Sequence, residues 1–206
     1  MLKLYFSKGS SALAAHILLE EAHAVYTTQE VSIPKGRHMS PEFLCISPKG
    51  RVPVLETTEG VISENPAILE YIAARHPDAN LLPQGVFEQA KARSLCAYLC
   101  ATAHVAFAHK HRGARWVDDS DAVLAMQQKV PQNLVECAAY LEKHVMQGAW
   151  ALGDDYSFCD PYLFLFGRWM AANTLTLDTY PKLATHHAAM RARRATIIAL
   201  IAHGLG

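Results

Sequence analysis

One segment, from Pro48 to Ala73 with the sequence PKGRVPVLETTEGVISENPAILEYIA, limits the possible folds of this chain more than any other. It opens on turn residues, continues into a short apolar run after Pro53, and turns again at Gly60. Two short extended runs separated by a glycine turn predict a β-hairpin. Pro53 falls at the start of the first strand, where its missing backbone N–H costs least.

A helix is expected directly after this hairpin. Ser63 or Asn65 can cap its N-terminus, and Pro66 suits its first turn. The apolar residues that follow recur at helical spacing, at Ala67, Ile68, Tyr71 and Ile72. The segment thus predicts a strand–turn–strand–helix unit with polar and acidic side chains at the N-terminus of a helix.

The residues before this unit alternate between strand and helix patterns. Residues 2–6 and 25–33 have the composition of strands. Residues 11–22 have helical apolar spacing, and a brief helix is expected over 40–46. The resulting order, βαβαββα, predicts a mixed sheet with helices on its faces. We therefore expect an α/β, thioredoxin-like domain over residues 1–77, without a C-x-x-C motif.

The remainder of the chain is predicted to be an all-helical bundle domain over residues 88–206, joined to the first domain by a linker at 78–87. One long helix is expected from Glu88 to His111. The next is expected to begin at a Ser120 cap, and Pro131 should kink or break it.

Composition excludes several classes of function. The 206 residues have a formal net charge of zero at pH 7, so charge gives no argument for nucleic acid or a membrane surface. No run approaches the ~18 apolar residues of a membrane span. Met1 leads directly into a strand pattern, with no signal-peptide region. We expect a cytoplasmic protein without nucleic-acid or membrane partners.

The cysteines and the remaining charged clusters have ordinary structural interpretations. An odd number of cysteines at apolar positions indicates buried free thiols in a reducing compartment: Cys45, Cys96, Cys100, Cys137 and Cys159. The histidine pairs lack carboxylate or cysteine companions at metal-ligand spacing, so no metal site is predicted. The basic run at Arg191, Arg193 and Arg194 is expected to be a solvated helix face.

Motifs in both halves resemble one family. The runs R-V-P-V-L at 51–55 and S-E-N-P-A-I at 63–68 are similar to the glutathione-binding half of a cytosolic glutathione S-transferase. Ser157 and Asp160 form an S-x-x-D capping box like the one in that family. Y-L-F-x-x-x-R-W at 162–169 resembles the bacterial beta class in particular. The resemblance covers nearly the whole chain.

The resemblance implies a glutathione site. Pro53 would be cis, and Val52 would offer its backbone N–H and C=O to the cysteinyl part of glutathione. Glu64 and Asn65, at the start of the helix, would hold the γ-glutamyl end.

Two cations are implied at the glycyl end. Lys35 matches a beta-class lysine that contacts the glycyl carboxylate, although a solvated loop lysine is an alternative. Arg51 would reach the same carboxylate or bridge to a partner subunit. The family also implies a homodimer.

Three residues are candidates for activating the thiol. A hydroxyl at a helix N-terminus favours a thiolate by its hydrogen bond and by the helix dipole. The resemblance places Ser11 where the beta class usually has cysteine, so Ser11 would donate to the thiolate. Ser10 is the alternative, because the alignment could be shifted by one residue here. Both serines could also serve only as helix caps. His104 matches a histidine near the glutathione sulfur; the alternative is an ordinary interior histidine.

The activity implied is that of a glutathione transferase in detoxification, which transfers glutathione thiolate to a hydrophobic electrophile. A second hypothesis is another glutathione-dependent enzyme on the same fold: an isomerase, a dehalogenase, an ether-cleaving enzyme or a peroxidase. The third is a non-catalytic binding protein. Fold alone cannot choose among them.

Overall fold

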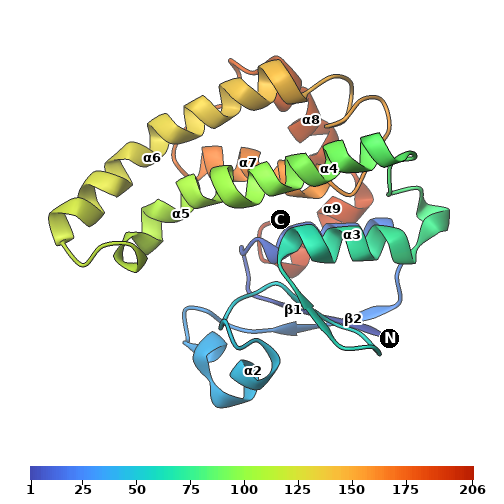
Figure 1. Ribbon diagram of the computed structural model, residues 1–206, viewed down its shortest axis with the longest axis horizontal. Coiled ribbons are helices and arrows are strands. Elements are labelled where there is room, and N and C mark those ends of the chain that lie inside the picture. The colour runs from blue at the N-terminus through green and yellow to red at the C-terminus, as the bar shows by residue number, and fades with distance from the viewer.

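The computed structural model describes all 206 residues. Its first part is a four-stranded sheet in the order β2-β1-β3-β4, with β1 parallel to β2 and antiparallel to β3 (Figure 1). The elements are β1 (Leu2–Phe6), α1 (Ala12–Glu21), β2 (Tyr26–Glu30), α2 (Pro41–Ile46), β3 (Val54–Glu56), β4 (Val61–Ser63) and α3 (Asn65–Arg75). The predicted βαβαββα order and thioredoxin-like fold are confirmed.

The second part is entirely helical, as predicted. Its elements are α4 (Val86–Tyr98), α5 (His104–Arg112), α6 (Ser120–Tyr140), α7 (Asp160–Ala171), α8 (Pro181–Ala192) and α9 (Arg194–Ala202). A π-helical turn at Leu99–Ala103 joins α4 to α5, so the two form one long helical rod across the molecule (Figure 1). The expected long helix is therefore present, with a π turn immediately before His104.

Helix α6 corrects two expectations. Its N-cap is Asp119 and not Ser120, because the Asp119 carboxylate accepts hydrogen bonds from the backbone N–H groups of Asp121 and Ala122, at 2.8 and 2.9 Å. The helix also continues through Pro131 without a break. Val130, Leu134 and Ala138 are fully buried on one face of α6, and this burial offsets the ~3 kcal/mol cost of an interior proline.

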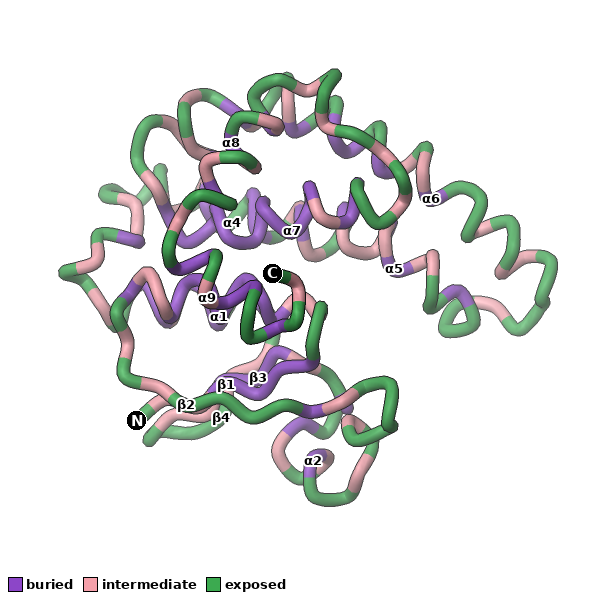
Figure 2. The backbone as a smooth tube through the Cα atoms, turned by 180° about the vertical axis from the view of Figure 1, so that it is seen from behind, coloured by how far each residue is buried: buried purple, intermediate pink, exposed green.

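One hydrophobic core connects the sheet to the helical part. Helix α1 is buried from Ala12 to Leu19 and packs against α3, α7 and α9 (Figure 2). The core cluster runs from Leu4 in the sheet to Leu200 in α9. A shared core of this kind fixes the two parts relative to each other, and so fixes any cleft between them.

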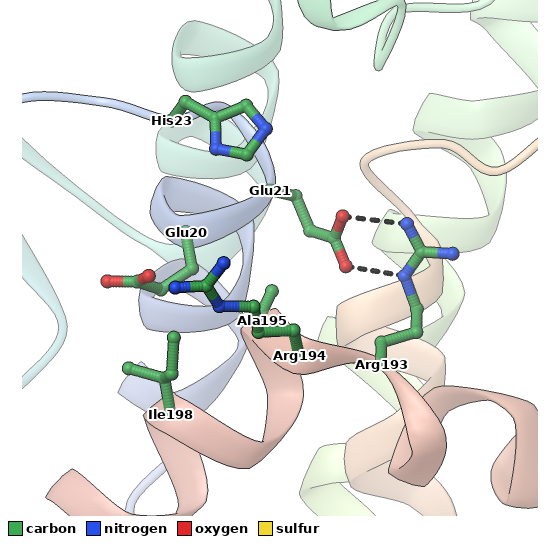
Figure 3. A pocket seen from close by; sticks show the side chains of 7 residues that line it. All are labelled: Glu20, Glu21, His23, Arg193, Arg194, Ala195 and Ile198. Atoms are coloured by element: carbon green, nitrogen blue, oxygen red, sulfur yellow. Dashed lines mark hydrogen bonds and ion pairs between the residues drawn. The ribbon is translucent and has the colours of Figure 1, made fainter.

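An ion pair reinforces this junction and corrects the expected solvation of Arg193. Arg193, between α8 and α9, donates two hydrogen bonds to Glu21 at the end of α1, one of them 2.7 Å long (Figure 3). Its guanidinium also lies 4.1 Å from the ring centre of Tyr156. Arg193 therefore ties the helical part to the sheet part, while its neighbours Arg191 and Arg194 form no ion pair.

The cysteines are all free, but not all are buried. Cys96, Cys137 and Cys159 are buried as expected. Cys45 is exposed, because α2 turns Phe43 and not Cys45 to the interior, and Cys100 is half-buried. None of the helices is long and apolar enough to cross a lipid bilayer.

Candidate active site

A cleft of about 380 Å³ lies between the sheet part and the α4–α5 rod. Seven of the nine predicted site residues line it: Ser11, Arg51, Val52, Pro53, Glu64, Asn65 and His104. The two exceptions are Ser10 and Lys35. Lys35 is exposed in the turn that follows β2, outside the residues that line the cleft.

Val52 and Pro53 form one wall of the cleft, and backbone hydrogen-bonding groups in this wall have no partner within the chain. The peptide bond between them is cis, as expected from the family resemblance. Ser47 holds the preceding residue in place, because its hydroxyl donates to the carbonyl of Arg51 at 3.0 Å and accepts from the N–H of Arg51 at 3.3 Å. No hydrogen bond within the chain uses the backbone N–H or C=O of Val52. A peptide in the cleft can therefore pair with Val52 as an added strand would.

The start of α3 forms a polar corner of the cleft. Glu64 occupies the N-cap position with a φ of 75°, an unfavourable conformation for a residue with a side chain. Neither Ser63 nor Asn65 caps the helix, which corrects that expectation, whereas Pro66 does lie in its first turn. No side chain accepts a hydrogen bond from the first backbone N–H groups of α3. The N-terminus of this helix is therefore free to bind a carboxylate.

Two contacts position the side chains of this corner. The amide nitrogen of Asn65 donates to the carbonyl of Ser11 at 3.0 Å, which joins the starts of α1 and α3. Lys49 pairs with the carboxylate of Glu64 and donates to the hydroxyl of Ser63 at 2.9 Å. Sequence reasoning missed Lys49 because its position beside Gly50 indicated only a turn residue.

The two neighbouring serines have different surroundings. The Ser10 hydroxyl accepts from the backbone N–H groups of Ala12 and Ser7, at 3.3 and 3.4 Å, and does not line the cleft. Ser11 is the N-cap of α1, lines the cleft, and its hydroxyl makes no hydrogen bond. Ser10 thus has the capping contact, while Ser11 has the free hydroxyl.

His104 lies at the start of α5 and faces the same cleft. Its ring stacks on Trp169 with centroids 4.7 Å apart, and its Nδ1 lies 3.5 Å from the Tyr162 hydroxyl. Burial, with the charges of Arg112 and Arg51, lowers the pKa of His104 to about 4. The imidazole is therefore neutral near pH 7, so it can exchange a hydrogen bond with a ligand but supplies no positive charge.

Sequence reasoning also missed a group of residues further along the rod. Cys100, Arg112, Arg115 and Trp116 all line the cleft. Arg112 follows His104 by eight residues, a spacing that keeps both on one face of α5, and Arg115 lies in the 3-10 turn Gly113–Arg115 that follows the helix. This helical spacing was the available signal. Burial raises the pKa of Cys100, so this thiol is a poor nucleophile near neutral pH.

Comparisons with known proteins agree with this geometry. A family model described as "Glutathione S-transferase, N-terminal domain" matches residues 2–74. Glutathione S-transferase GstA of Escherichia coli O157:H7 is 28% identical over 207 residues, which cover 99% of this chain and all of that protein. Maleylacetoacetate isomerase of Pseudomonas aeruginosa is 27% identical over 92% of this chain and 94% of the isomerase.

A solved structure matches this chain over its whole length. A glutathione transferase homologue from Sulfitobacter, crystallised with bound glutathione, superposes with a TM-score of 0.95. It is 36% identical to this chain and covers 100% of this chain and 99% of its own. The cis proline, the open helix start and the cleft between the two parts are thus found in a chain that belongs to the glutathione S-transferase family.

Proposed function

We propose that this protein is a glutathione transferase, which binds glutathione in the cleft, stabilises its thiolate and transfers it to an electrophile with a hydrophobic body. One observation carries the proposal: Val52 with its unpaired backbone, the residues at the open start of α3, and Ser11 with its free hydroxyl all line one cleft. These are the groups that a thiol tripeptide with a carboxylate at each end requires.

The tripeptide is fixed mainly by backbone and charge. Its cysteinyl part pairs antiparallel with Val52. Its γ-glutamyl end lies at Glu64 and Asn65, where the helix start favours a carboxylate and Glu64 accepts the ammonium group. Arg51 is the cation for the glycyl carboxylate, because it lines the cleft and Lys35 does not.

Ser11 activates the thiol in this scheme. A free thiol has a pKa of ~8.5 and is only a few per cent ionised at pH 7. A hydrogen bond to a charged group contributes ~1.5–3 kcal/mol, which places the pKa of the bound thiol at about 6.5–7.5. His104, being neutral, orients the sulfur or the electrophile without adding charge.

The assembly proposed is a homodimer, because dimers with two-fold symmetry are the commonest oligomers of soluble proteins. It would bring the sheet part of one subunit against the α4–α5 rod of the other. Val61 in the hairpin and Phe87 in the rod are exposed apolar side chains on these surfaces, at 49% and 71%. A monomer by light scattering at micromolar concentration would contradict this part of the proposal.

An isomerase is the second candidate, favoured by the similarity to maleylacetoacetate isomerase. In that chemistry the thiolate adds to a double bond and is expelled again, so glutathione is not consumed. In a transferase one glutathione disappears for each product formed. Counting the glutathione consumed per turnover with an electrophile panel distinguishes the two, and a protein that binds glutathione without any turnover would be the non-catalytic alternative.

The binding test uses Glu64→Ala and calorimetry with glutathione. We expect the dissociation constant to rise at least tenfold, or about 1.4 kcal/mol, because the variant loses the acceptor for the ammonium group. Glu59→Ala is the control, since it removes an exposed carboxylate from the hairpin turn outside the cleft. Equal affinities in wild type and Glu64→Ala would refute the assignment of the γ-glutamyl site.

A further inference from the structure

The cleft has more positive charge than glutathione requires. Arg51, Arg112 and Arg115 line it, and none of these guanidinium groups forms an ion pair or a side-chain hydrogen bond within the chain. The only acidic residue that lines the cleft is Glu64, and it already pairs with Lys49. Elsewhere in the molecule Arg93 and Arg193 have carboxylate partners, whereas the other arginines form no ion pair and do not line this cleft: Arg37, Arg75, Arg168, Arg191 and Arg194. Unpaired cations that share one cleft point to an anionic ligand.

Glutathione does not neutralise this charge. The tripeptide with its thiol ionised has two carboxylates, one ammonium and one thiolate, and therefore two net negative charges. The cleft has four cationic side chains and one carboxylate. One positive charge remains in excess after glutathione is bound.

The excess positive charge lies at the C-terminal end of the rod, away from the residues assigned to glutathione. Glutathione takes the start of α3 and Arg51, so the unclaimed cations are Arg112, at the end of α5, and Arg115 in the turn that follows. Side chains on a helix lean toward its N-terminus, which directs Arg112 back toward His104. The charge of Arg112 does act on His104, since it contributes to the lowered pKa of that histidine.

An apolar surface lies beside these two arginines. The indole of Trp116 lines the cleft and is 48% exposed. Val105 and Ala108 line the part of the rod between His104 and Arg112. A flat apolar group fits such a surface, and guanidinium groups next to it match the planar fork of a carboxylate.

We propose that the electrophile of this enzyme carries a carboxylate, held by Arg112 and Arg115, on a flat apolar body that lies against Trp116. This inference rests on the proposed transferase function and names the class of its second substrate. Arg112 and Arg115 are substrate-binding residues in it, while Ser11 remains the group that acts on the thiol. An acidic side chain from a second copy of the chain is the competing partner for these arginines.

The test uses a matched pair of electrophiles. One is a chlorodinitrobenzoate with its carboxylate para to the chloride, and the other is its methyl ester. In both, the thiolate sulfur forms a bond to the ring carbon, and chloride leaves with the electron pair of the carbon–chlorine bond. Dividing kcat/KM by the uncatalysed rate constant removes the difference in intrinsic reactivity.

We expect wild type to prefer the acid over the ester by about tenfold, since bidentate pairs to arginine are strong but partly screened at an exposed site. The double variant Arg112→Gln/Arg115→Gln should lose most of this preference through a higher KM for the acid, with a much smaller change in the kcat/KM of the ester. Arg75→Gln is the control, because it removes an exposed arginine outside the cleft. It should keep the preference.

Two outcomes would overturn the inference: no preference for the acid in wild type, or a preference that survives the double variant, whether that variant is dimeric or monomeric. Calorimetry with dinitrobenzoate lacking the chloride, against its methyl ester, tests the same site without catalysis. If dinitrobenzoate binds in an arginine-dependent way but neither chlorinated electrophile reacts, the carboxylate site stands and the transferase function fails. If both electrophiles react without regard to charge, the transferase function stands and the carboxylate site fails.

Discussion

Several polar groups at the junction of α1 with α7–α9 have partners that the chain itself supplies, whereas several of those in the cleft have none. At the junction, buried Asp160 accepts hydrogen bonds from the N–H groups of Ala151 and Ser157, at 2.8 and 2.7 Å, and contacts His186 at 2.9 Å. Arg193 pairs with Glu21 there. In the cleft, Arg112, Arg115 and Ser11 have no partner.

This difference distinguishes charges that hold the fold from charges that await a ligand. A buried polar group without a partner lowers the free energy of unfolding, so those that pack the two parts together must be satisfied. A group in an open cleft is hydrated until a ligand replaces the water. Arg193, which has a partner within the chain, therefore holds the fold together, whereas Arg112 and Arg115, which share the cleft without partners, are candidates for binding a ligand.

Replacing one arginine in each region tests whether the two regions differ as described. Arg193→Gln leaves Glu21 without its cation, and the Glu21 side chain is only 11% exposed. We expect a loss of about 2–3 kcal/mol in the free energy of unfolding, somewhat below the cost of breaking a fully buried pair. Arg112→Gln should change it by no more than about 0.5 kcal/mol. Urea unfolding at one fixed protein concentration measures both, and equal losses would remove the distinction.

Several buried side chains at the junction depart from this pattern because they have polar atoms without hydrogen-bond partners, among them His16, Thr196 and His203. His203 follows α9, is 1% exposed, and neither ring nitrogen has a hydrogen-bond partner. It lies 5.4 Å from the His16 ring and 4.7 Å from the Phe6 ring. Burial, with smaller effects from the charges of His16 and Arg168, lowers the pKa of His203 to about 3.

This histidine should make the fold sensitive to acid. Its pKa is lower in the folded than in the unfolded state, so its full contribution to stability is present above pH ~6.5 and is lost as pH falls from there toward 3. Between pH 7 and pH 5 the loss is about 2 kcal/mol. His203→Leu should flatten the pH dependence of the free energy of unfolding by this amount. An unchanged slope would mean that protonated His203 is accommodated in the fold.

The sequence predicted local structure well because local structure follows from periodicity and turn chemistry. The hairpin before Glu64 and the rod containing His104 were both predicted from spacing. Pro131 was predicted to kink or break α6, and it does not break the helix because the packing of distant helices outweighs a local preference. The Ser120 cap was wrong by one residue, since either side chain could cap and only the structure selects Asp119.

The partners of side chains could not be predicted in the same way. Glu21 and Arg193 are 172 residues apart, and nothing in either local sequence indicates the pairing. The same limit applies to Lys49, which meets Glu64 only when the hairpin closes. Seven of nine predicted residues line the cleft because the family motifs contain them. The arginines beyond His104 lie outside those motifs, and only the continuous rod brings them into the cleft.

The smallest expected effect concerns two adjacent serines. They differ in the same way as the two regions do, because one hydroxyl has partners within the chain and the other has none. Ser10 has partners in the backbone N–H groups of Ala12 and Ser7, whereas the Ser11 hydroxyl has none and faces the cleft. If a free hydroxyl marks the ligand site, Ser11→Ala should raise the pKa of the bound glutathione thiol and reduce turnover at pH 6.5 about tenfold. The deficit should shrink above pH 9, where the thiolate forms without help, and glutathione affinity should change little.

Ser10→Ala is the matched variant for this test. It should cost about 1 kcal/mol of stability through the lost cap and leave the pH profile of turnover unchanged. The reverse result, with the pH-dependent loss in Ser10→Ala alone, would show that the hydroxyl seen capping α1 turns to the thiol when glutathione binds. If neither variant alters the profile, serine does not activate the thiol. The remaining groups near the sulfur are then the neutral imidazole of His104 and the backbone N–H groups at the start of α1. Ser11→Ala would leave both in place, so a wild-type thiol pKa in that variant would assign the activation to them.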